Sequence, residues 1–344
     1  MEAKMVAVGY AASLPITEER SLFEFETLMP RPGGRDLLVR VKAVSVNPVD
    51  VKVRMRKQGT EAEPVVLGWD AAGIVAAVGR DCSLFRPGDH VYYAGNINRP
   101  GTNAPFHLVD ERIVGRKPKS IGFAQAAALP LTTITAWELL FDRIGVKRGA
   151  GAEHRSLLVV GGAGGVGSIA IQLARKLTSL TVIATASRPQ TRDWVKGLGA
   201  QHVIDHTQPF APQLQAVGFA SVDIVLALTG TQRNAAQIVD VISPLGRLGL
   251  IEGVDSLRAF DAAALWSKSI SIHPELMFAR ASFATPDMIE QHQLLDEAAD
   301  LVDSGLLRTT MAANLGPLSA DRLRRAHAQL ESGTTIGKVV LELG

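Results

Sequence analysis

The 344-residue sequence predicts an α/β protein with two domains, a doubly wound parallel sheet and a partly closed β-barrel. Three observations predict this fold. Strands alternate with helices between about residues 130 and 275. Short strands separated by Gly and Pro turns precede that segment. A glycine-rich turn joins a buried strand to a helix near the start of the alternating segment.

The first 128 residues are predicted to be mostly β. Residues 37–46 alternate and are rich in β-branched side chains, residues 73–78 form a small-residue strand, and residues 90–93 follow a Pro-Gly turn. Residues 126–141 (AAALPLTTITAWELLF) predict a helix interrupted by a loop.

The alternating segment predicts a parallel sheet with right-handed crossovers. Its expected strands are residues 157–160, 180–186, 203–204, 222–228, 247–251 and 269–273, and its expected helices are 166–177, 189–198 and 234–242. In the tail, residues 287–304 and 319–331 predict amphipathic helices, and 338–342 a closing strand. We expect this tail to fold back onto the N-terminal domain, which gives domains of 1–129 with 276–344, and 130–275.

The glycine-rich turn predicts dinucleotide binding. In LLVVGGAGGVGSIAIQLARKL, an apolar strand leads into Gly162-x-Gly164-x-x-Gly167 and then directly into a helix. Gly162 is expected to make the tight turn, Gly164 to let the backbone approach a pyrophosphate, and Gly167 to allow close packing of the helix on the strand. The N–H groups of the first helical turn, which includes Gly165 and Val166, would face the anion.

Composition excludes several other classes. The net charge of +2 is spread without a basic block, which argues against nucleic-acid binding, and no apolar run has the length of a membrane span. The first residues lack the pattern of a signal peptide, so we expect a cytoplasmic enzyme. Cys82 is the only cysteine, which excludes an internal disulfide and a cysteine-rich metal site, and we expect its thiol to be inert.

Six motifs in order resemble the medium-chain dehydrogenase/reductase superfamily, and within it the zinc-independent quinone oxidoreductase (zeta-crystallin-like) branch. They are VSVNPVDVKVR (44–54), PVVLGWDAAGIVAAVG (64–79), FRPGDHVYYAG (85–95), ALPLTTITAWELL (128–140), VVGGAGGVG (159–167) and GKVVLE (337–342). The resemblance covers essentially the whole chain. It implies a GroES-like barrel, a Rossmann domain and an active site in the cleft between them.

The chain departs from the zinc enzymes of this superfamily at the catalytic zinc ligands. Asn47, Trp69 and Leu131 stand at the positions that match those ligands, and none of these side chains suits zinc. Asp50 and Asp70 remain nearby, but two carboxylates without thiolate or imidazole partners make a poor zinc site. We therefore expect no catalytic metal.

The expected cofactor is NADPH. Ser187 and Arg188 stand where an NAD-specific strand would end in an acid, and a hydroxyl beside an arginine suits a 2′-phosphate. The alternative is that Arg188 is only a solvated residue at a helix start. The resemblance adds His206, Thr135 and Lys338 to the cofactor residues, although His206 can also be structural and Lys338 an ordinary strand-edge lysine.

The expected reaction is hydride transfer from NADPH to a small molecule, either a quinone or an α,β-unsaturated carbonyl compound. Asn47 is expected to hold the acceptor carbonyl or the nicotinamide ribose, Lys52 to contact substrate or deliver a proton, and Tyr93 to line the cleft. Each has a structural alternative: a helix cap for Asn47, an exposed lysine for Lys52, and barrel core with an internally bonded hydroxyl for Tyr93.

Two other functions remain open at this stage, a zinc-type alcohol dehydrogenase and a non-catalytic NADPH-binding protein. The sequence does not determine the natural acceptor. By resemblance we expect a homodimer that pairs through the edge strand near residues 269–273.

Overall fold

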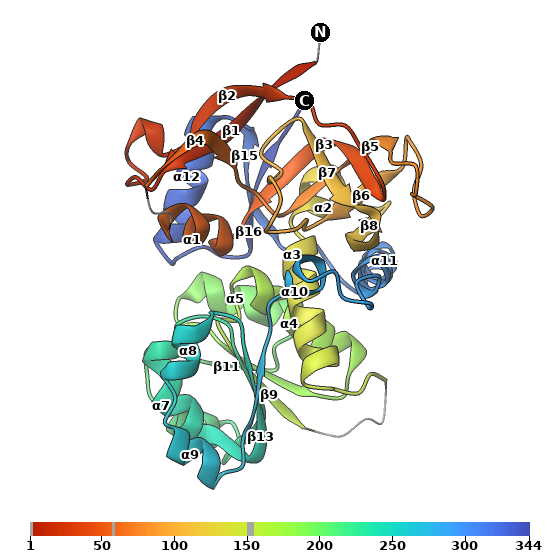
Figure 1. Ribbon diagram of the computed structural model, residues 1–344. Helices are drawn as coiled ribbons and strands as arrows, with labels where there is room; N and C mark the ends of the chain where they lie inside the picture. Colours follow the sequence, from red (N-terminus) through yellow and green to blue (C-terminus); the bar gives the residue numbers. More distant parts are fainter. Residues whose placement is uncertain (1–2, 57–58, 150–154) are drawn as a thin grey trace. The chain divides into compact units, whose positions relative to one another are not determined.

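The computed structural model describes residues 3–56, 59–149 and 155–344, and Figure 1 shows how their elements are arranged. The chain forms two compact units. Unit 1 is Met1–Ile134 together with Phe278–Gly344, and unit 2 is Thr135–Met277. The structure therefore divides the chain after residues 134 and 277, where the sequence analysis divides it after 129 and 275.

Unit 1 contains two sheets within the described residues. A three-stranded sheet has the order β2-β1-β4, and a seven-stranded sheet has the order β15-β16-β3-β5-β6-β8, with β7 also paired to β3. The strands are β1 (Lys4–Ala12), β2 (Phe23–Leu28), β3 (Asp36–Val46), β4 (Thr60–Val66), β5 (Ala71–Val78), β6 (His90–Tyr93), β7 (Phe106–Asp110), β8 (Val114–Arg116), β15 (Met311–Pro317) and β16 (Lys338–Glu342).

The C-terminal strand lies beside an N-terminal strand. β16 pairs antiparallel with β3, so that Val339 stands opposite Val46 and Val340 opposite Ser45. β15 in turn pairs parallel with β16. This register brings the first residue of β16, Lys338, next to the end of β3, although the two positions are far apart in the sequence.

The helices of unit 1 include α1 (Pro48–Arg56), α2 (Phe123–Ala127), α10 (Ala279–Ser282), α11 (Glu290–Asp303) and α12 (Ala320–Glu331). α1 begins directly after β3 because Pro48 fits the first helical position, where its missing N–H would have no intrahelical partner. α12 is capped by Ser319, whose hydroxyl accepts a hydrogen bond from Arg322 N at 3.3 Å, as its position before the helix predicts.

The helical segment that contains α2 is interrupted before Pro130, as predicted. α2 ends at Ala127, and α3 (Pro130–Trp137) begins at a proline, which disfavours helical geometry for the residue before it. α3 continues into a π-helical turn, Glu138–Arg143. Arg143 Nε donates to Glu275 Oε2 at 2.7 Å, which ties this turn to the segment after the last strand of unit 2. Burial and the neighbouring carboxyl group of Glu138 raise the pKa of Glu275.

Unit 2 is a six-stranded parallel sheet with the order β11-β10-β9-β12-β13-β14. Its strands are β9 (Ser156–Val160), β10 (Thr181–Thr185), β11 (His202–Ile204), β12 (Val222–Ala227), β13 (Ile242–Leu250) and β14 (Ser271–Pro274). Every residue of β9 is buried, as expected for a central strand covered on both faces. The order reverses at β9, because β10 lies on one side of it and β12 on the other.

Helices cover both faces of this sheet (Figure 1). They are α4 (Gly165–Leu177), α5 (Pro189–Leu198), α6 (Phe210–Ala216), α7 (Thr231–Val241), α8 (Val254–Arg258) and α9 (Ala262–Ser267). The alternation of strands and helices confirms the predicted doubly wound sheet. The sequence analysis missed α6, α8 and α9, which are short; α6 follows Pro209 and α8 follows Gly253.

The sequence analysis also missed β1, β2, β4, β7, β8 and β15. β4 illustrates the reason. It lies at an edge of its sheet, its residues Thr60–Glu63 are exposed, and Pro64 lies within it. An edge strand that buries little surface shows no alternating apolar pattern, and a proline lowers the apparent strand propensity further.

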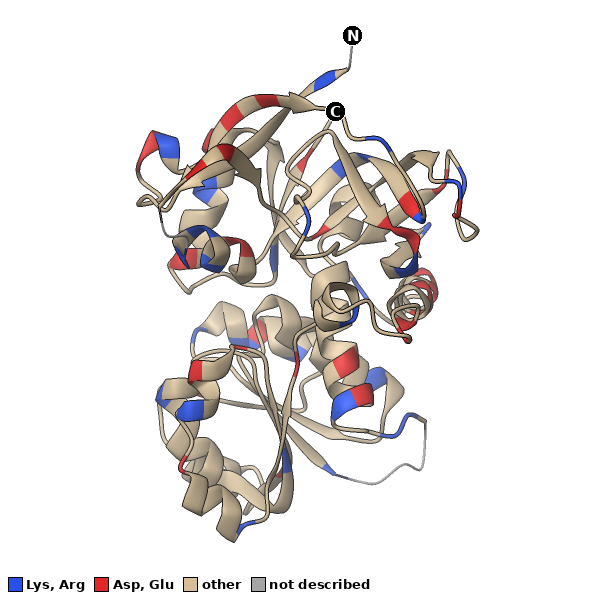
Figure 2. Cartoon of the chain, in the orientation of Figure 1, with Lys and Arg blue, Asp and Glu red and all other residues tan. Residues whose placement is uncertain are grey.

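Helix α11 carries acidic residues and no Lys or Arg, whereas basic and acidic side chains are interspersed over most of both units (Figure 2). This agrees with the small net charge of +2. Among the described residues, no helix combines the length and apolar character required to cross a membrane.

Candidate active site

The glycine-rich turn connects the carboxyl end of β9 to the start of α4. Gly161 has a φ of +90°, a conformation that residues with a side chain rarely adopt. Gly161 therefore makes the tight turn, and the assignment of that role to Gly162 is corrected. Gly162 is instead required by packing, because a Cβ at this position would lie 2.9 Å from the Cβ of Ala184 on β10.

The other two glycines of the motif differ in what surrounds them. A Cβ on Gly167 would lie 2.4 Å from Gly161 O and 2.8 Å from Gly162 Cα, so only glycine lets α4 approach the turn this closely. A Cβ on Gly164 would meet only Gly161 O, at 3.5 Å. The space in front of Gly164 is therefore not filled by the protein.

The start of α4 presents hydrogen-bond donors to this space. Ser168 N makes the first hydrogen bond within the helix, to Gly164 O at 2.9 Å. The N–H groups of Gly165, Val166 and Gly167 precede that bond and so have no acceptor inside the helix. Together with the positive end of the helix dipole and the reversal of strand order at β9, this geometry fits the pyrophosphate of a dinucleotide.

Basic residues gather near the ends of the neighbouring strands. Ser187 and the exposed Arg188 follow β10, and the half-buried His206 follows β11, as the sequence analysis expects. Arg188 N donates to Thr191 Oγ1 at 3.1 Å, which fixes the start of α5. The sequence analysis missed Arg233, an exposed residue in the first turn of α7.

The positive charges of Arg233 and Arg188 both act on the imidazole of His206. Burial lowers the pKa of His206 below its usual value. The carboxylate of Asp205 opposes this shift, whereas the positive charges of Arg233 and Arg188 add to it. Asp205 Oδ1 accepts hydrogen bonds from the N–H and the hydroxyl of Thr207, at 2.8 and 2.7 Å. Since Arg233 follows no recognised motif, no spacing in the sequence indicated it.

Thr135 and Lys338 occupy different surroundings. Thr135 is 5% exposed within α3. Lys338 is 3% exposed at the start of β16, and its Nζ donates to Val46 O, Asn47 Oδ1 and Asp70 Oδ2 at 3.0, 2.5 and 3.0 Å. All three of its N–H donors are thus used inside unit 1.

A buried polar cluster surrounds Asn47 at the junction of β3 and α1. Asn47 Nδ2 donates to Asp70 Oδ2 at 3.1 Å and to Ser45 O at 3.3 Å, and its Oδ1 accepts from Lys338. Asp70 Oδ1 accepts from Leu131 N at 3.1 Å. The side chain of Asn47 therefore joins the cluster, while Asp50 accepts from Asn47 N at 2.7 Å at the start of α1.

Burial dominates the titration of both acids in this cluster. It raises the pKa of Asp50 to about 7, against the hydrogen bond from Asn47 N and the charge of Lys338. It also raises the pKa of Asp70, against the charge of Lys338 and the hydrogen bond from Leu131. The polar groups that contact Asp70 are all donors, however, and this favours its ionised form.

The cluster does not fit zinc. Zinc in proteins is held by thiolate, imidazole or carboxylate groups. Asn47 offers an amide, and the indole Nε1 of Trp69 donates to Asn96 O at 3.2 Å. Leu131 donates its backbone N–H to Asp70, and its aliphatic side chain has no atom that can bind zinc. Among the residues that the structure describes, no three His, Cys, Asp or Glu side chains are placed to hold a metal ion.

The other two predicted catalytic residues differ in exposure. Lys52 is half-buried on α1. Tyr93 is completely buried at the end of β6, where its hydroxyl lies 3.2 Å from His107 Nδ1 and its ring stacks on the imidazole. Burial lowers the pKa of His107 to about 4 and raises that of Tyr93, so both side chains are neutral. This matches the alternative in which Tyr93 belongs to the barrel core.

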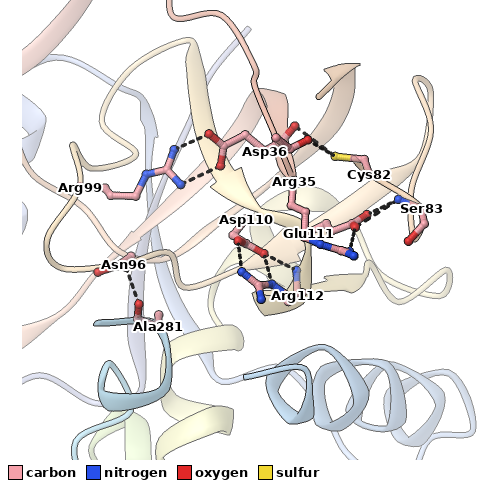
Figure 3. Close-up of polar contacts among 11 residues, drawn as sticks. Arg35, Asp36, Cys82, Ser83, Asn96, Arg99, Asp110, Glu111, Arg112 and Ala281 are labelled. Atoms are coloured by element: carbon pink, nitrogen blue, oxygen red, sulfur yellow. Dashed lines mark hydrogen bonds and ion pairs between the residues drawn. The ribbon is translucent and has the colours of Figure 1, made fainter. Parts of the chain in front are cut away.

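A second polar network in unit 1 ties loops to β3 and β7 (Figure 3). Arg99 contacts both carboxylate oxygens of Asp36, at 2.7 and 3.0 Å, and Arg112 Nη2 lies 2.8 Å from Asp110 Oδ2. These arginines line a cavity of about 90 Å³. Because each is paired with a carboxylate, we interpret this network as structural.

Cys82 lies in the same region (Figure 3). Its Sγ is 3.4 Å from Asp36 O. Burial raises the pKa of the thiol, and the carboxylate of Glu111 raises it further. The thiol therefore stays protonated, which agrees with the expectation that it is inert.

Comparison with known families relates both units to oxidoreductases. Residues 33–135 match the alcohol dehydrogenase GroES-like domain, and residues 198–341 match the zinc-binding dehydrogenases. A zinc-type alcohol dehydrogenase-like protein of Staphylococcus aureus (strain MSSA476) is 41% identical over 98% of this chain and 100% of its own length. The 2-methylene-furan-3-one reductase of Solanum lycopersicum is 30% identical over 92% of this chain and 74% of its own.

Solved structures share the fold. A crystal structure from Rhizobium etli CFN 42, provisionally named a zinc-dependent alcohol dehydrogenase protein, is 56% identical, covers 99% of both chains and has a TM-score of 0.94. The quinone oxidoreductase from Coxiella burnetii is 26% identical over 99% of this chain and 100% of its own, with a TM-score of 0.80.

Proposed function

Since the chain belongs to the medium-chain dehydrogenase/reductase superfamily, with a GroES-like domain and a Rossmann domain, we propose that it is an NADPH-dependent oxidoreductase. Its acceptor is a quinone or an α,β-unsaturated carbonyl compound, and the reaction needs no catalytic metal. The observation that carries this proposal is that one chain holds both an open glycine turn at β9 and a buried polar cluster at Asn47 whose side chains do not fit zinc.

The cofactor residues follow from the contacts of unit 2. Gly165, Val166 and Gly167 would hold the pyrophosphate through backbone N–H groups, and Gly164, whose own N–H donates to Gly161 O at 3.2 Å, would leave the space for it. Ser187, Arg188 and His206, joined by Arg233, would hold the 2′-phosphate of the adenosine ribose, because two guanidinium groups and a hydroxyl are suitable donors. Thr135 remains a candidate contact to the nicotinamide half. When bound, NADPH supplies the hydride.

The chain's own residues would then bind and orient the acceptor. An acceptor that is already electrophilic needs positioning and hydrogen-bond donors rather than a Lewis acid. Lys52 is the proposed contact to the acceptor oxygen, because its side chain is only half-buried. Asn47 and Tyr93 are proposed to act by position, since Asn47 is bonded to Asp70 and Lys338, and Tyr93 to His107.

The names of similar proteins support this acceptor class. One relative is named as an enone reductase and one solved structure as a quinone oxidoreductase. Both acceptor classes take hydride at carbon while negative charge develops on oxygen. A single set of donors in the protein can therefore serve either.

The test is turnover with purified protein. We expect oxidation of NADPH, followed by its absorbance, with an enal or with 9,10-phenanthrenequinone, and no loss of rate after treatment with EDTA or 1,10-phenanthroline. Alcohol oxidation that a chelator abolishes would identify a zinc-type alcohol dehydrogenase instead. Tight NADPH binding without turnover of any acceptor would identify a non-catalytic binding protein.

A further inference from the structure

The ammonium group of Lys338 lies at a point where three oxygen atoms converge. Val46 O, Asn47 Oδ1 and Asp70 Oδ2 are 3.0, 2.5 and 3.0 Å from its Nζ. The side chain of Lys338 is 3% exposed and that of Asp70 is not exposed at all. A lysine is rarely buried to this extent unless its charge is compensated, and here a carboxylate and two further oxygens compensate it.

The backbone holds this side chain in place. Lys338 N donates to Thr310 O at 2.9 Å, and the next residue, Val339, stands opposite Val46 in the pairing of β16 with β3. An ammonium group has three donors, and the three oxygens use all of them. The position of Nζ is therefore determined by the sheet and by the cluster together.

The same oxygens would otherwise form a negative, oxygen-rich cage. Asp70 accepts from Asn47 Nδ2 and Leu131 N as well as from Lys338, so its surroundings stabilise a carboxylate. Asp50 adds a second acid whose Oδ1 is buried without a partner among the described residues. A carboxylate, an amide oxygen and a backbone carbonyl, with Asp50 hydrogen-bonded to Asn47 N beside them, would resemble the oxygen ligands of a hard divalent cation if the ammonium group were removed.

We propose that Lys338 is the fixed internal cation of this cluster, and that it takes the place of a bound metal ion among the oxygens of Val46, Asn47 and Asp70. A metal ion at this point would collide with Nζ and be repelled by its charge. This is a second reason, besides the residue types at Asn47, Trp69 and Leu131, why the cluster does not fit zinc although residues 198–341 match the zinc-binding dehydrogenases. The charge that Lys338 places at the cluster is independent of the proposed hydride transfer.

The first test is metal binding by the unchanged protein. After incubation with Zn²⁺ or Mn²⁺ and exhaustive dialysis, we expect far less than one metal ion per chain by elemental analysis, and no shift of Tm with either ion. One tightly bound ion per chain that Asp70→Asn abolishes would overturn the proposal.

The second test removes the cation. Lys338→Ala should lower Tm, and Mn²⁺ should restore much of the loss, because the ion can enter the oxygen cage. We expect Lys338→Ala to bind Mn²⁺ about tenfold or more tightly than the unchanged protein does. Lys42→Ala, which removes a half-buried lysine from the same sheet, is the matched control and should gain no affinity. Adding Asp70→Asn to Lys338→Ala should abolish the gain.

Equal Mn²⁺ affinity for Lys338→Ala and Lys42→Ala would contradict the proposal. If Lys338→Ala yields only unfolded protein, the Tm of Lys338→Met is compared with that of the double variant Lys338→Met with Asp70→Asn. Lys338→Met leaves the buried carboxylate of Asp70 without its cation, whereas adding Asp70→Asn leaves two uncharged side chains. A buried charge without a partner lowers stability, so the double variant should have a higher Tm than Lys338→Met alone. A double variant with the same or a lower Tm would overturn the proposal.

Discussion

Gly164 and Gly167 lack a side chain for different physical reasons. A Cβ on Gly167 would collide with backbone atoms of the turn, whereas a Cβ on Gly164 would meet only Gly161 O at 3.5 Å. Gly167 must therefore be glycine for the turn to fold, and Gly164 must be glycine for the proposed ligand to bind. A glycine spacing alone cannot separate these roles, because both appear as the same letter.

Gly164→Val should leave the protein folded and reduce NADPH affinity by about a hundredfold or more, because the valine methyl groups would take the place of the pyrophosphate. Calorimetry measures the affinity and circular dichroism the fold. Gly33→Val is the control, since a Cβ there meets no atom within 4 Å. Unchanged NADPH affinity in Gly164→Val would refute the cofactor assignment.

Arg188 and Arg233 carry the proposed preference for NADPH. Replacing either by Ala should weaken NADPH by about tenfold while NADH changes little, because only NADPH has the 2′-phosphate. The ratio of the two Kd values is the measurement. Lys176→Ala, at the opposite end of α4 from the glycine turn, should leave this ratio unchanged. An equal loss for both coenzymes would remove the argument for phosphate recognition.

At the scale of elements, α1 and α12 are joined by a buried charge. Arg54 on α1 is 1% exposed, donates from Nη1 to Leu14 O at 2.6 Å and pairs with Glu331 on α12. His327 on α12 is completely buried beside it. Burial lowers the pKa of His327 to about 3, and the positive charge of Arg54 lowers it further.

This histidine should make the protein less stable in acid. Its pKa is about 3 in the folded state and 6.5 by reference, so between these values the unfolded chain binds a proton that the folded chain does not. The free energy of unfolding should therefore fall as the pH drops below about 6.5, by about 1.4 kcal/mol for each pH unit from this group alone.

His327→Leu should remove that part of the pH dependence. Urea unfolding at several pH values between 4 and 7 gives the free energy of unfolding at each pH. Its slope against pH should correspond to about one proton fewer taken up on unfolding than in the unchanged protein. His90→Gln, a change at an exposed histidine, should keep the slope of the unchanged protein. The same slope in His327→Leu would show that this histidine is not held neutral.

At the scale of the whole molecule, unit 2 exposes an unpaired sheet edge. β14 is the terminal strand of its sheet. Trp266 and Leu245, which come before β14 in the sequence, are 86% and 77% exposed. Leu245 also has a φ of +62°, which is unusual for a residue other than glycine. An exposed edge with apolar residues favours association, and we propose a homodimer through β14.

Light scattering after gel filtration should then give twice the chain mass of 36.7 kDa. Trp266→Asp should increase the monomer fraction, because it places a charge in the proposed interface. Phe283→Asp, at a residue of unit 1 that is 79% exposed, is the control and should leave the mass unchanged. A monomer at all concentrations in the unchanged protein would exclude this assembly.

The parallel sheet of unit 2, the position of the glycine turn and the interruption at Pro130 could all be predicted from the amino-acid sequence. These features depend on local patterns, namely apolar runs, glycine spacing and the missing N–H of proline, which are visible within about twenty residues. The sequence also indicated the departures from zinc ligands at Asn47, Trp69 and Leu131, since residue type alone decides which side chains can bind zinc.

The contacts of those residues could not be predicted from the sequence, because they depend on how distant segments pack together. The pairing of β16 with β3 brings Lys338 to Asn47 and Asp70, which lie 291 and 268 positions away in the chain, and so makes it part of a buried ion cluster. The fold likewise brings the positive charge of Arg233 close enough to His206 to lower its pKa. Contacts of this kind depend on strand register and helix placement, which no local pattern in the sequence encodes.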